Sequence, residues 1–394
     1  MANTTTVQAS VLYGAQDLRT EYRTITAPEP HELQISIRST GICGSDQHYY
    51  NHYRNGDILV REPMSLGHES AGVVEAMGSS VPAGSFNLGD RVALEVGLPC
   101  GTCDRCREGR YNICTKMSFR SSAKSFPHSQ GTLQQRINHP AQWCHKLPPN
   151  VSLDEGALLE PFSVAIHAVR RASLAPGSTT LVLGAGAVGL LTAAMLRVKG
   201  SSKIVIADIE ALRVNFAIQN ECADFGFVVP RKRGVTIDEK LEIAVETAEL
   251  ASSAAGGERF DAVFECTGVE ACVQTAIYAT RPGGKVLLIG MGTPIQTLPI
   301  SAAALREVDL VGVFRYAKTY PYGISVLADK GKSEITRGVG RSLPDLSKLI
   351  THRYSGLENI PEAFKMAGRG VDDEGNLVLK NSKRELEELE SCDP

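Results

Sequence analysis

The stretch of residues 179–189 reads TTLVLGAGAVG, and it decides the fold of this chain. Its first five residues favour a β-strand, and a helical pattern follows it, with Leu190, Leu191, Ala194 and Val198 on one face. A second apolar run at residues 204–207 ends at Asp208. G-x-G-x-x-G alone is a weak signal. A strand before it, a helix after it and an acid about twenty residues on together predict a dinucleotide-binding turn.

The residues of this turn indicate which dinucleotide is bound. Gly184, Gly186 and Gly189 allow a tight turn and let a pyrophosphate approach the helix N-terminus, where amides and the helix dipole favour anions. Asp208 can accept both ribose hydroxyls of NAD, whereas its charge disfavours the 2′-phosphate of NADP. Arg213 tempers this preference, because a nearby arginine can pair with a phosphate. The sequence therefore predicts NAD.

Further strand and helix patterns alternate after this turn. Apolar runs occur at residues 261–266, 285–290 and 308–314, and a turn with two glycines, residues 281–284, precedes the second of them. Residues 235–257 have the pattern of a longer helix between strands. This alternation predicts an α/β domain with a doubly wound parallel sheet.

Upstream, Cys43 and the triplet Gly67-His68-Glu69 supply three residue types that bind zinc. Three protein ligands indicate a catalytic metal with an open position rather than a closed structural site. Ser45, Asp46 and His48 add a hydroxyl, a carboxylate and an imidazole beside Cys43. Taken alone, Cys43 or His68 is better explained as a core cysteine or a surface histidine. Together, and with the dinucleotide turn downstream, they favour a metal.

Four further cysteines follow the pattern C-x2-C-x2-C-x7-C: Cys100, Cys103, Cys106 and Cys114. Four thiolates at short spacing are typical of a closed tetrahedral zinc site. An iron–sulfur cluster is the rival interpretation, but the bacterial ferredoxin run ends in C-x3-C. Because a closed site leaves no room for substrate, we predict that this lobe is structural.

Composition limits the remaining classes of function. A chain of 394 residues is expected to form two or three domains. Its net charge of −3 provides no drive toward nucleic acid or anionic membranes, and it has no apolar run long enough for a membrane span. Without a secretory signal, the ten cysteines favour a reducing cytoplasmic location. The run at residues 383–388 reads as a charged, exposed end.

With these motifs in order, the chain resembles the zinc-dependent medium-chain dehydrogenases, and within them the polyol branch, from residue 8 to residue 380. The resemblance rests on GICGSD at 41–46, GHE at 67–69, GALLEP at 156–161 and GVFRY at 312–316. It implies a GroES-like, β-rich catalytic domain at 1–165, a Rossmann domain at 166–310 and a return to the catalytic domain at 311–394. The segment 231–258 is longer than the family leads us to expect.

The resemblance also implies roles for particular residues. Zinc is expected on Cys43, His68 and Glu69, with Glu160 bound to the metal directly or through its water and Asp46 orienting His68. Tyr49, Glu160, Arg315 and Tyr316 match positions that face the substrate or its bound water. Candidates for the proton path are the zinc-bound water held by Glu160 and a relay from Ser45 toward His48. The positions that match NAD contacts are Gly184, Gly186, Val188, Gly189, Asp208, Arg213, Ile289, Gly290, Met291, Val313, Phe314 and Arg315.

The activity implied is NAD-dependent oxidation of a polyol, such as sorbitol or xylitol, to a ketose, with two zinc ions per chain and a homotetrameric assembly. An L-arabinitol 4-dehydrogenase remains a close alternative, because pentitol and hexitol enzymes share these motifs. Glu160 in place of a cysteine argues against a simple alcohol or threonine dehydrogenase. A cysteine-rich module for nucleic-acid or protein binding is disfavoured by the absence of a basic face. Intact Cys43, Ser45 and His68 disfavour a relative that binds NAD without turnover.

Overall fold

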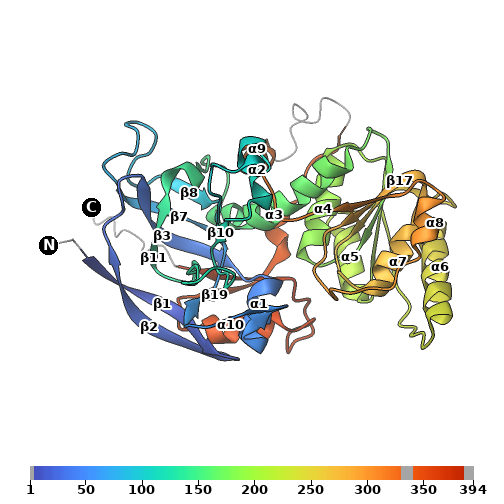
Figure 1. The fold of residues 1–394 in the computed structure, drawn as a ribbon, viewed down its shortest axis with the longest axis horizontal. Coiled ribbons are helices and arrows are strands. Elements are labelled where there is room, and N and C mark those ends of the chain that lie inside the picture. The colour runs from blue at the N-terminus through green and yellow to red at the C-terminus, as the bar shows by residue number, and fades with distance from the viewer. Residues whose placement is uncertain (1–3, 330–339, 386–394) are drawn as a thin grey trace. The chain divides into compact units, whose positions relative to one another are not determined.

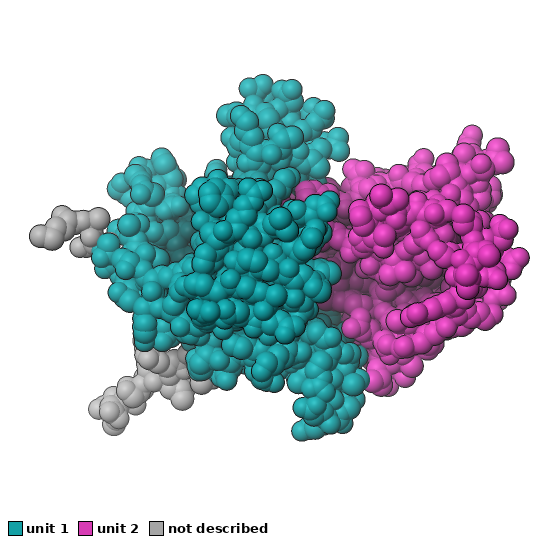
Figure 2. Space-filling view, turned by 60° about the horizontal axis from the view of Figure 1, so that its bottom comes forward, with its two compact units in different colours: residues 1–160, 347–394 teal, residues 161–346 magenta. Residues whose placement is uncertain are grey.

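The chain folds into two compact units, which Figure 2 shows in different colours. The computed structural model describes residues 4–329 and 340–385. Unit 1 combines Met1–Glu160 with Ser347–Pro394, and unit 2 contains Pro161–Leu346. Among the helices in the described ranges, none is long and apolar enough to cross a membrane.

Unit 2 is built around a six-stranded sheet with the order β15-β14-β13-β16-β17-β18. Figure 1 shows this unit, with β17 and the helices α4 to α8 labelled. All neighbouring strands run parallel. Numbered within the unit, this is the order 3-2-1-4-5-6 of doubly wound dinucleotide-binding folds, so the predicted fold class is confirmed. The strands are β13 (Thr179–Leu183), β14 (Lys203–Asp208), β15 (Phe225–Val228), β16 (Phe260–Glu265), β17 (Thr280–Leu288) and β18 (Asp309–Gly312).

Helices alternate with these strands and share one apolar core with them. Leu181, Val205 and Val263 from the strands are fully buried against Ala248 of α6 and Ile277 of α7. The predicted helix at 235–257 is observed as α6, which starts where the Thr236 hydroxyl accepts from the Glu239 amide. The helices are α4 (Ala187–Val198), α5 (Ala211–Gln219), α6 (Ile237–Ala254), α7 (Glu270–Ala279), α8 (Ile300–Ala304) and α9 (Tyr320–Asp329), and α3 (Leu153–Ala172) spans the boundary between the units.

Unit 1 is mostly antiparallel β-structure. Its main sheet has the order β12-β8-β7-β3-β20-β19, and β11 also pairs with β3. These strands are β3 (Glu32–Gly41), β7 (Glu69–Met77), β8 (Arg91–Leu94), β11 (Arg136–Pro140), β12 (Cys144–Lys146), β19 (Ile350–Ser355) and β20 (Lys380–Arg384). A second sheet contains β2 (Asp17–Thr26), β1 (Thr4–Gly14) and β6 (Met64–Ser65).

Short elements of unit 1 carry much of its chemistry. The two small strand pairs are β4 (Arg54–Asn55) with β5 (Ile58–Leu59), and β9 (Gly97–Leu98) with β10 (Ser118–Phe119). The helices are α1 (Gly44–His52), α2 (Asp104–Arg107) and α10 (Ile360–Ala367), together with the 3-10 turns η1 (Tyr111–Ile113), η2 (Ala141–Trp143) and η3 (Leu346–Leu349).

Two expectations about unit 2 need correction. We predicted that the chain returns to the catalytic domain at residue 311, but unit 2 continues to Leu346, because β18 completes the parallel sheet beside β17. The turn predicted at residues 281–284 lies within β17. Thr280 pairs with Phe260 and pairing resumes at Lys285, so the intervening residues form an irregularity inside the strand.

The expected charged, exposed end at residues 383–388 is wrong for its first residue. Lys383 lies in β20 with 0% of its surface exposed, and its ammonium pairs with Glu385 at 2.5 Å. Strand β20 is held between β19 and β3, so this segment is interior to the main sheet. Residues 386–388 lie outside the described part of the chain.

Candidate metal centres and cofactor crevice

The strand pairing of unit 1 brings Cys43, His68 and Glu69 together. Gly41, the last residue of β3, pairs with Glu69, the first residue of β7. Cys43 follows β3 by two residues and lies at the N-terminus of α1. As a result, one ligand atom from each of Cys43, His68 and Glu69 lies within 4.8 Å of the others. The structure thus places the three predicted ligands in one cluster.

The buried Asp46 carboxylate contacts two of the three ligand residues. Asp46 is 0% exposed, and its carboxylate accepts from the Cys43 amide at 3.2 Å and the Gly67 amide at 3.3 Å. The same carboxylate lies 3.3 Å from Nδ1 of His68. Because Nδ1 faces Asp46, Nε2 remains as the metal-binding nitrogen of His68. Burial opposes the charge of Asp46, but His68 and the donors around it hold the pKa of Asp46 below its usual value.

Lys380 is a member of this site that sequence reasoning missed. Its ammonium, on β20, forms a hydrogen bond and an ion pair with the Glu69 carboxylate, and both side chains are buried. Burial lowers the pKa of Lys380, but the negative charges of Glu69, Cys43 and Glu160 outweigh it and raise that pKa. Glu160, on α3 and 5% exposed, therefore lies within electrostatic reach of the cluster.

These residues fit a zinc ion. Thiolate, imidazole and carboxylate are all zinc ligands, and three of them leave a coordination position open. The Glu69 carboxylate packs directly on the backbone of Gly41, because a Cβ at position 41 would come 2.2 Å from Oε2 of Glu69. The Glu69 carboxylate is thereby confined beside the ligand atoms of Cys43 and His68.

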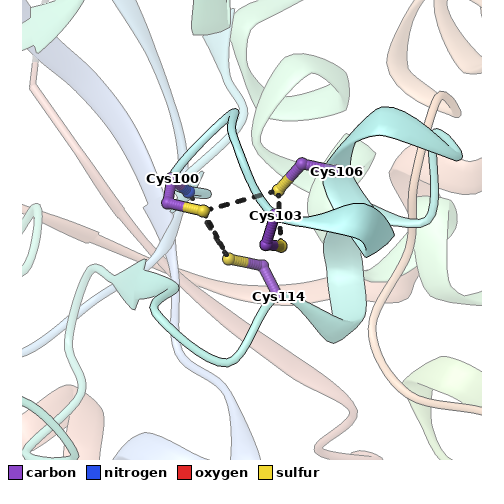
Figure 3. Close-up of side chains that lie close together, drawn as sticks. All are labelled: Cys100, Cys103, Cys106 and Cys114. Carbon is purple, nitrogen blue, oxygen red and sulfur yellow. Dashed lines mark hydrogen bonds between the residues drawn. The ribbon is translucent and has the colours of Figure 1, made fainter.

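The four cysteines of the second cluster point toward one another (Figure 3). Their sulfur–sulfur distances are 3.5 Å for Cys103–Cys106, 3.5 Å for Cys114–Cys100 and 3.9 Å for Cys100–Cys106. Four sulfurs at the usual Zn–S distance from one tetrahedral centre would lie about 3.8 Å apart. All four are free thiols. Hydrogen bonds from Thr102 lower the pKa of Cys100 to about 5, whereas burial and the neighbouring thiols raise the pKa of Cys106 to about 12.

The glycine-rich turn of unit 2 has the shape that a dinucleotide requires. A Cβ on Gly189 would come 1.8 Å from the Gly184 carbonyl oxygen, so helix α4 approaches strand β13 as closely as its backbone allows. A Cβ on Gly184 would come 2.7 Å from Thr267. At Gly186 the nearest atom is a guanidinium nitrogen of Arg213, 3.7 Å away, so a hydrogen there leaves space for a phosphate at the start of α4.

The carboxyl ends of the neighbouring strands complete this crevice. Asp208, the last residue of β14, accepts from the Ala185 amide at 2.7 Å and from the Glu210 amide at 2.9 Å. Glu265 ends β16, and its main-chain oxygen accepts from Ile289 at 2.9 Å and Gly290 at 3.0 Å. The Glu265 carboxylate binds the Thr267 and Gly268 amides. Sequence reasoning did not identify Glu265, which ties two loops of the crevice together.

The remaining predicted residues are divided between the two units. In unit 1, Ser45 is half-buried and His48 is exposed one helical turn later on α1, whereas Tyr49 is 2% exposed and its hydroxyl accepts from the Ala123 amide at 3.3 Å. In unit 2, Arg315 has a positive φ of 49° and its guanidinium lies 4.9 Å from the ring centroid of Phe314. The others in unit 2 are half-buried Val188, Ile289, Gly290 and Val313, exposed Met291 and buried Tyr316.

Comparison with known proteins agrees with this geometry. The model of the alcohol dehydrogenase GroES-like domain matches residues 29–149, and that of the zinc-binding dehydrogenase matches residues 187–329. A sorbitol dehydrogenase from Gallus gallus is 40% identical over 94% of this chain and 96% of its own length. An L-idonate 5-dehydrogenase from Vitis vinifera is 38% identical over 94% of this chain and 93% of its own length.

A solved structure supports the same assignment of the fold. An oxidoreductase of unknown specificity from Escherichia coli superposes with a TM-score of 0.82 and 29% sequence identity, and the match covers 97% of this chain and all of that chain. The metal-ligand cluster, the dinucleotide turn and these relatives agree. The chain therefore belongs to the zinc-dependent medium-chain dehydrogenases.

Proposed function

We propose that this enzyme oxidises a secondary hydroxyl of a polyol to a ketone, with NAD as hydride acceptor and sorbitol or xylitol as substrate. The observation that carries the proposal is the cluster of half-buried Cys43 with buried His68 and Glu69, with Glu160 close by. The 40% identity to a sorbitol dehydrogenase supports a polyol as the substrate. When bound, zinc would supply Lewis-acid polarisation of the substrate oxygen, and the nicotinamide would accept the hydride.

The residues of the chain would prepare the substrate for this transfer. Cys43, His68 and Glu69 would hold the metal, and Asp46 would fix the orientation of the His68 ring. One path for the hydroxyl proton would run through the water that Glu160 holds. A second path for the proton runs from half-buried Ser45 to exposed His48, since residues three apart lie on the same face of a helix. Tyr49, Arg315 and Tyr316 remain predicted substrate contacts.

Cofactor preference would be set in unit 2. Asp208 would accept the ribose hydroxyls of NAD, and its negative charge would repel the 2′-phosphate of NADP. Arg213, close to Gly186, would face the pyrophosphate of the cofactor. The NAD contacts at residues 289–291 and 313–315 follow from the family resemblance.

Four cysteines would hold a second, structural zinc, which gives two zinc ions per chain. A closed set of four thiolates offers no position for a substrate, so this ion would stabilise the lobe without taking part in turnover. The family resemblance further suggests a homotetramer in the cytoplasm. The mass of the native protein measured by light scattering tests the assembly.

Initial rates test the proposed substrate class. Sorbitol, xylitol, L-arabinitol and L-idonate should each be supplied with NAD and, separately, with NADP. We expect the largest kcat/KM for sorbitol or xylitol with NAD. A clear preference for L-arabinitol would support the alternative, an L-arabinitol 4-dehydrogenase. Preference for L-idonate would instead place the chain with its Vitis relative. Turnover of simple alkanols without turnover of any polyol would contradict the proposal.

A further inference from the structure

We infer that Ser121 is a positioning residue for the metal centre, which it serves by holding the Asp46 carboxylate against His68. The inference deepens the proposed function and depends on the proposed metal site. Ser121 follows the four-cysteine lobe by seven residues and belongs to no motif. Two independent features point to it: its backbone conformation and its hydrogen bond.

The backbone of Ser121 is in an unfavourable conformation. Its φ is 59°, in the left-handed region that residues with a side chain seldom adopt. Other non-glycine residues of this chain have a positive φ, but Ser121 is the one that is buried among those in the described ranges. Glycine or asparagine is more usual than serine at such a backbone conformation. A strained, buried conformation of this kind indicates that the surrounding structure requires it.

The neighbours of Ser121 explain how the conformation is imposed. The Arg120 guanidinium donates to Nδ1 of His139 at 3.0 Å and to the Gln130 carbonyl at 3.2 Å, which fixes the chain on one side. On the other side, Ser122 forms a β-bridge with Ser129. Between these two anchors the backbone has to turn sharply at Ser121, and the turn directs its side chain inward.

The inward-facing hydroxyl of Ser121 reaches Asp46. Its Oγ donates to Oδ1 of Asp46 at 2.6 Å, whereas the Gly67 amide and Nδ1 of His68 are each 3.3 Å from the same oxygen. A short hydroxyl–carboxylate bond is charge-assisted and stronger than the longer ones. Ser121 therefore fixes the oxygen that faces His68, and through it the orientation of the imidazole.

The same segment also contacts a predicted substrate residue. Two residues after Ser121, the Ala123 amide donates to the hydroxyl of Tyr49 at 3.3 Å. Asp46 and Tyr49 lie on α1, so the turn at Ser121 sets the position of this helix at two points. A change at Ser121 should consequently affect metal retention first and polyol binding second.

Two substitutions separate the hydroxyl from the backbone strain. Ser121→Ala removes the hydroxyl and keeps the strained φ, whereas Ser121→Gly removes both. If Ser121 acts through Asp46, both variants should release zinc from the centre faster. Loss of a residue that orients a metal ligand costs about 10–100-fold in affinity or activity. Ser121 acts on the metal ligand through Asp46 and not directly, so we expect a smaller effect than this, about three- to tenfold.

Ser173 provides a matched control in unit 2. It is also a serine with a positive φ, 50°, and its hydroxyl also bonds to a neighbour, the Arg170 carbonyl, at 3.1 Å. Ser173 is exposed and lies at the end of α3. Ser173→Ala and Ser173→Gly should leave zinc release unchanged. Any general effect of replacing a serine with a positive φ would appear in both the Ser121 and the Ser173 variants.

The experiment follows zinc release from the full-length, zinc-loaded protein after addition of a coloured chelator. The wild type should lose its ions in two phases, and the phase missing in Cys43→Ser belongs to the catalytic centre. In both Ser121 variants that phase should be about three- to tenfold faster, and the phase from the four cysteines unchanged. In an Asp46→Asn background, Ser121→Ala should add little, because both changes act on one interaction.

Unchanged release from both Ser121 variants would overturn the inference, as would a full additional effect in the Asp46→Asn background. Restored retention in Ser121→Gly alone would overturn it too, since strain and not the hydroxyl would then be the cause. These results differ from a failure of the proposed function. In that case, Cys43→Ser would hold as much zinc as the wild type, whatever happens at Ser121.

Discussion

The two cysteine-containing clusters of unit 1 differ in what holds their ligands. Cys43, His68 and Glu69 are fixed by other side chains: Asp46 contacts His68, and Lys380 pairs with Glu69. Both His68 and Glu69 are buried. In contrast, three of the four lobe cysteines are half-exposed, and their side-chain sulfurs contact mainly one another.

This difference indicates that the protein builds the two sites in different ways. A site whose ligands already have partners is preorganised, so its metal can bind a substrate without rebuilding the surroundings. A lobe whose metal ligands mainly contact one another depends on the metal for its fold. The first site is therefore suited to turnover and the second to structure.

Replacement of Cys43 by serine tests the catalytic side of this contrast and should have the largest effect. Loss of the thiolate weakens the metal that polarises the substrate, a contribution of several kcal/mol. We expect turnover to fall by at least about 10³-fold, at ~1.4 kcal/mol per factor of ten. NAD binding, measured by calorimetry, should survive. Persistent turnover would mean that the metal is held elsewhere.

Lys380→Met tests whether the catalytic site is held together before the metal arrives. Removing one partner of a buried ion pair costs about 3–5 kcal/mol, because the other charge remains buried and unpaired. We expect a loss of this size in the unfolding free energy of the zinc-free protein. The loss should be smaller in the zinc-loaded protein, where the metal would compensate the charge of Glu69. Urea unfolding with and without zinc measures both.

Lys383→Met serves as the control for that measurement. Lys383 is also buried on β20, but its partner is Glu385 and not a proposed metal ligand. Its effect on stability should be the same with and without zinc. If zinc alters the two variants equally, the special role given to Lys380 is wrong.

Cys103→Ser tests the structural side of the contrast. With one of four thiolates lost, the lobe should lose its zinc, and the melting temperature should fall by several degrees, at roughly 2–4 °C per kcal/mol for a domain of this size. The effect on kcat at low temperature should be much smaller than that of Cys43→Ser. Cys144→Ser is the control, because Cys144 is buried outside the cluster and should leave the zinc content unchanged. Unchanged melting in Cys103→Ser would count against a structural zinc.

His139 allows a smaller test, of the contacts around Arg120. It is 0% exposed; its Nδ1 accepts from Arg120 at 3.0 Å and its Nε2 donates to the Glu95 carbonyl at 3.2 Å. Burial and the Arg120 charge hold its pKa well below the usual value. Above about pH 6.5, this histidine is neutral in both the folded and the unfolded state, so its contribution to the unfolding free energy is fully present.

As the pH falls below that value, His139 binds a proton in the unfolded chain but stays neutral in the folded chain. The unfolding free energy should then fall by up to about 1.4 kcal/mol per pH unit from this group. His139→Gln should flatten this part of the profile, measured by urea unfolding between about pH 7.5 and pH 5.5. Identical slopes in the wild type and His139→Gln would contradict the assignment.

Local patterns predicted the parts of this molecule that local interactions determine. The strand, glycine turn and helix of residues 179–198 could be identified because each element is specified by its own neighbours. The metal ligands could be proposed because a cysteine, a histidine and a glutamate that occur together in this pattern are typical of a zinc site. The GroES-like fold of unit 1 followed from the family resemblance and not from periodicity.

Contacts over long sequence separations were not predictable in this way. Lys380 reaches Glu69 across 311 positions, and Ser121 reaches Asp46 across 75. Neither residue belongs to a motif, so nothing in its surroundings marks it. The mistake at Lys383 has the same origin. A run of charged residues reads as an exposed end until the pairing of β20 with β3 is known.

Zinc titration back into the metal-free protein tests the central claim most directly, with sorbitol and NAD turnover followed at each step. The account predicts no turnover without zinc and full turnover when two ions per chain are bound. It also predicts that Cys43→Ser binds one ion and stays inactive. Full turnover of the metal-free protein, or restored turnover of Cys43→Ser with zinc in the four-cysteine cluster alone, would contradict the account.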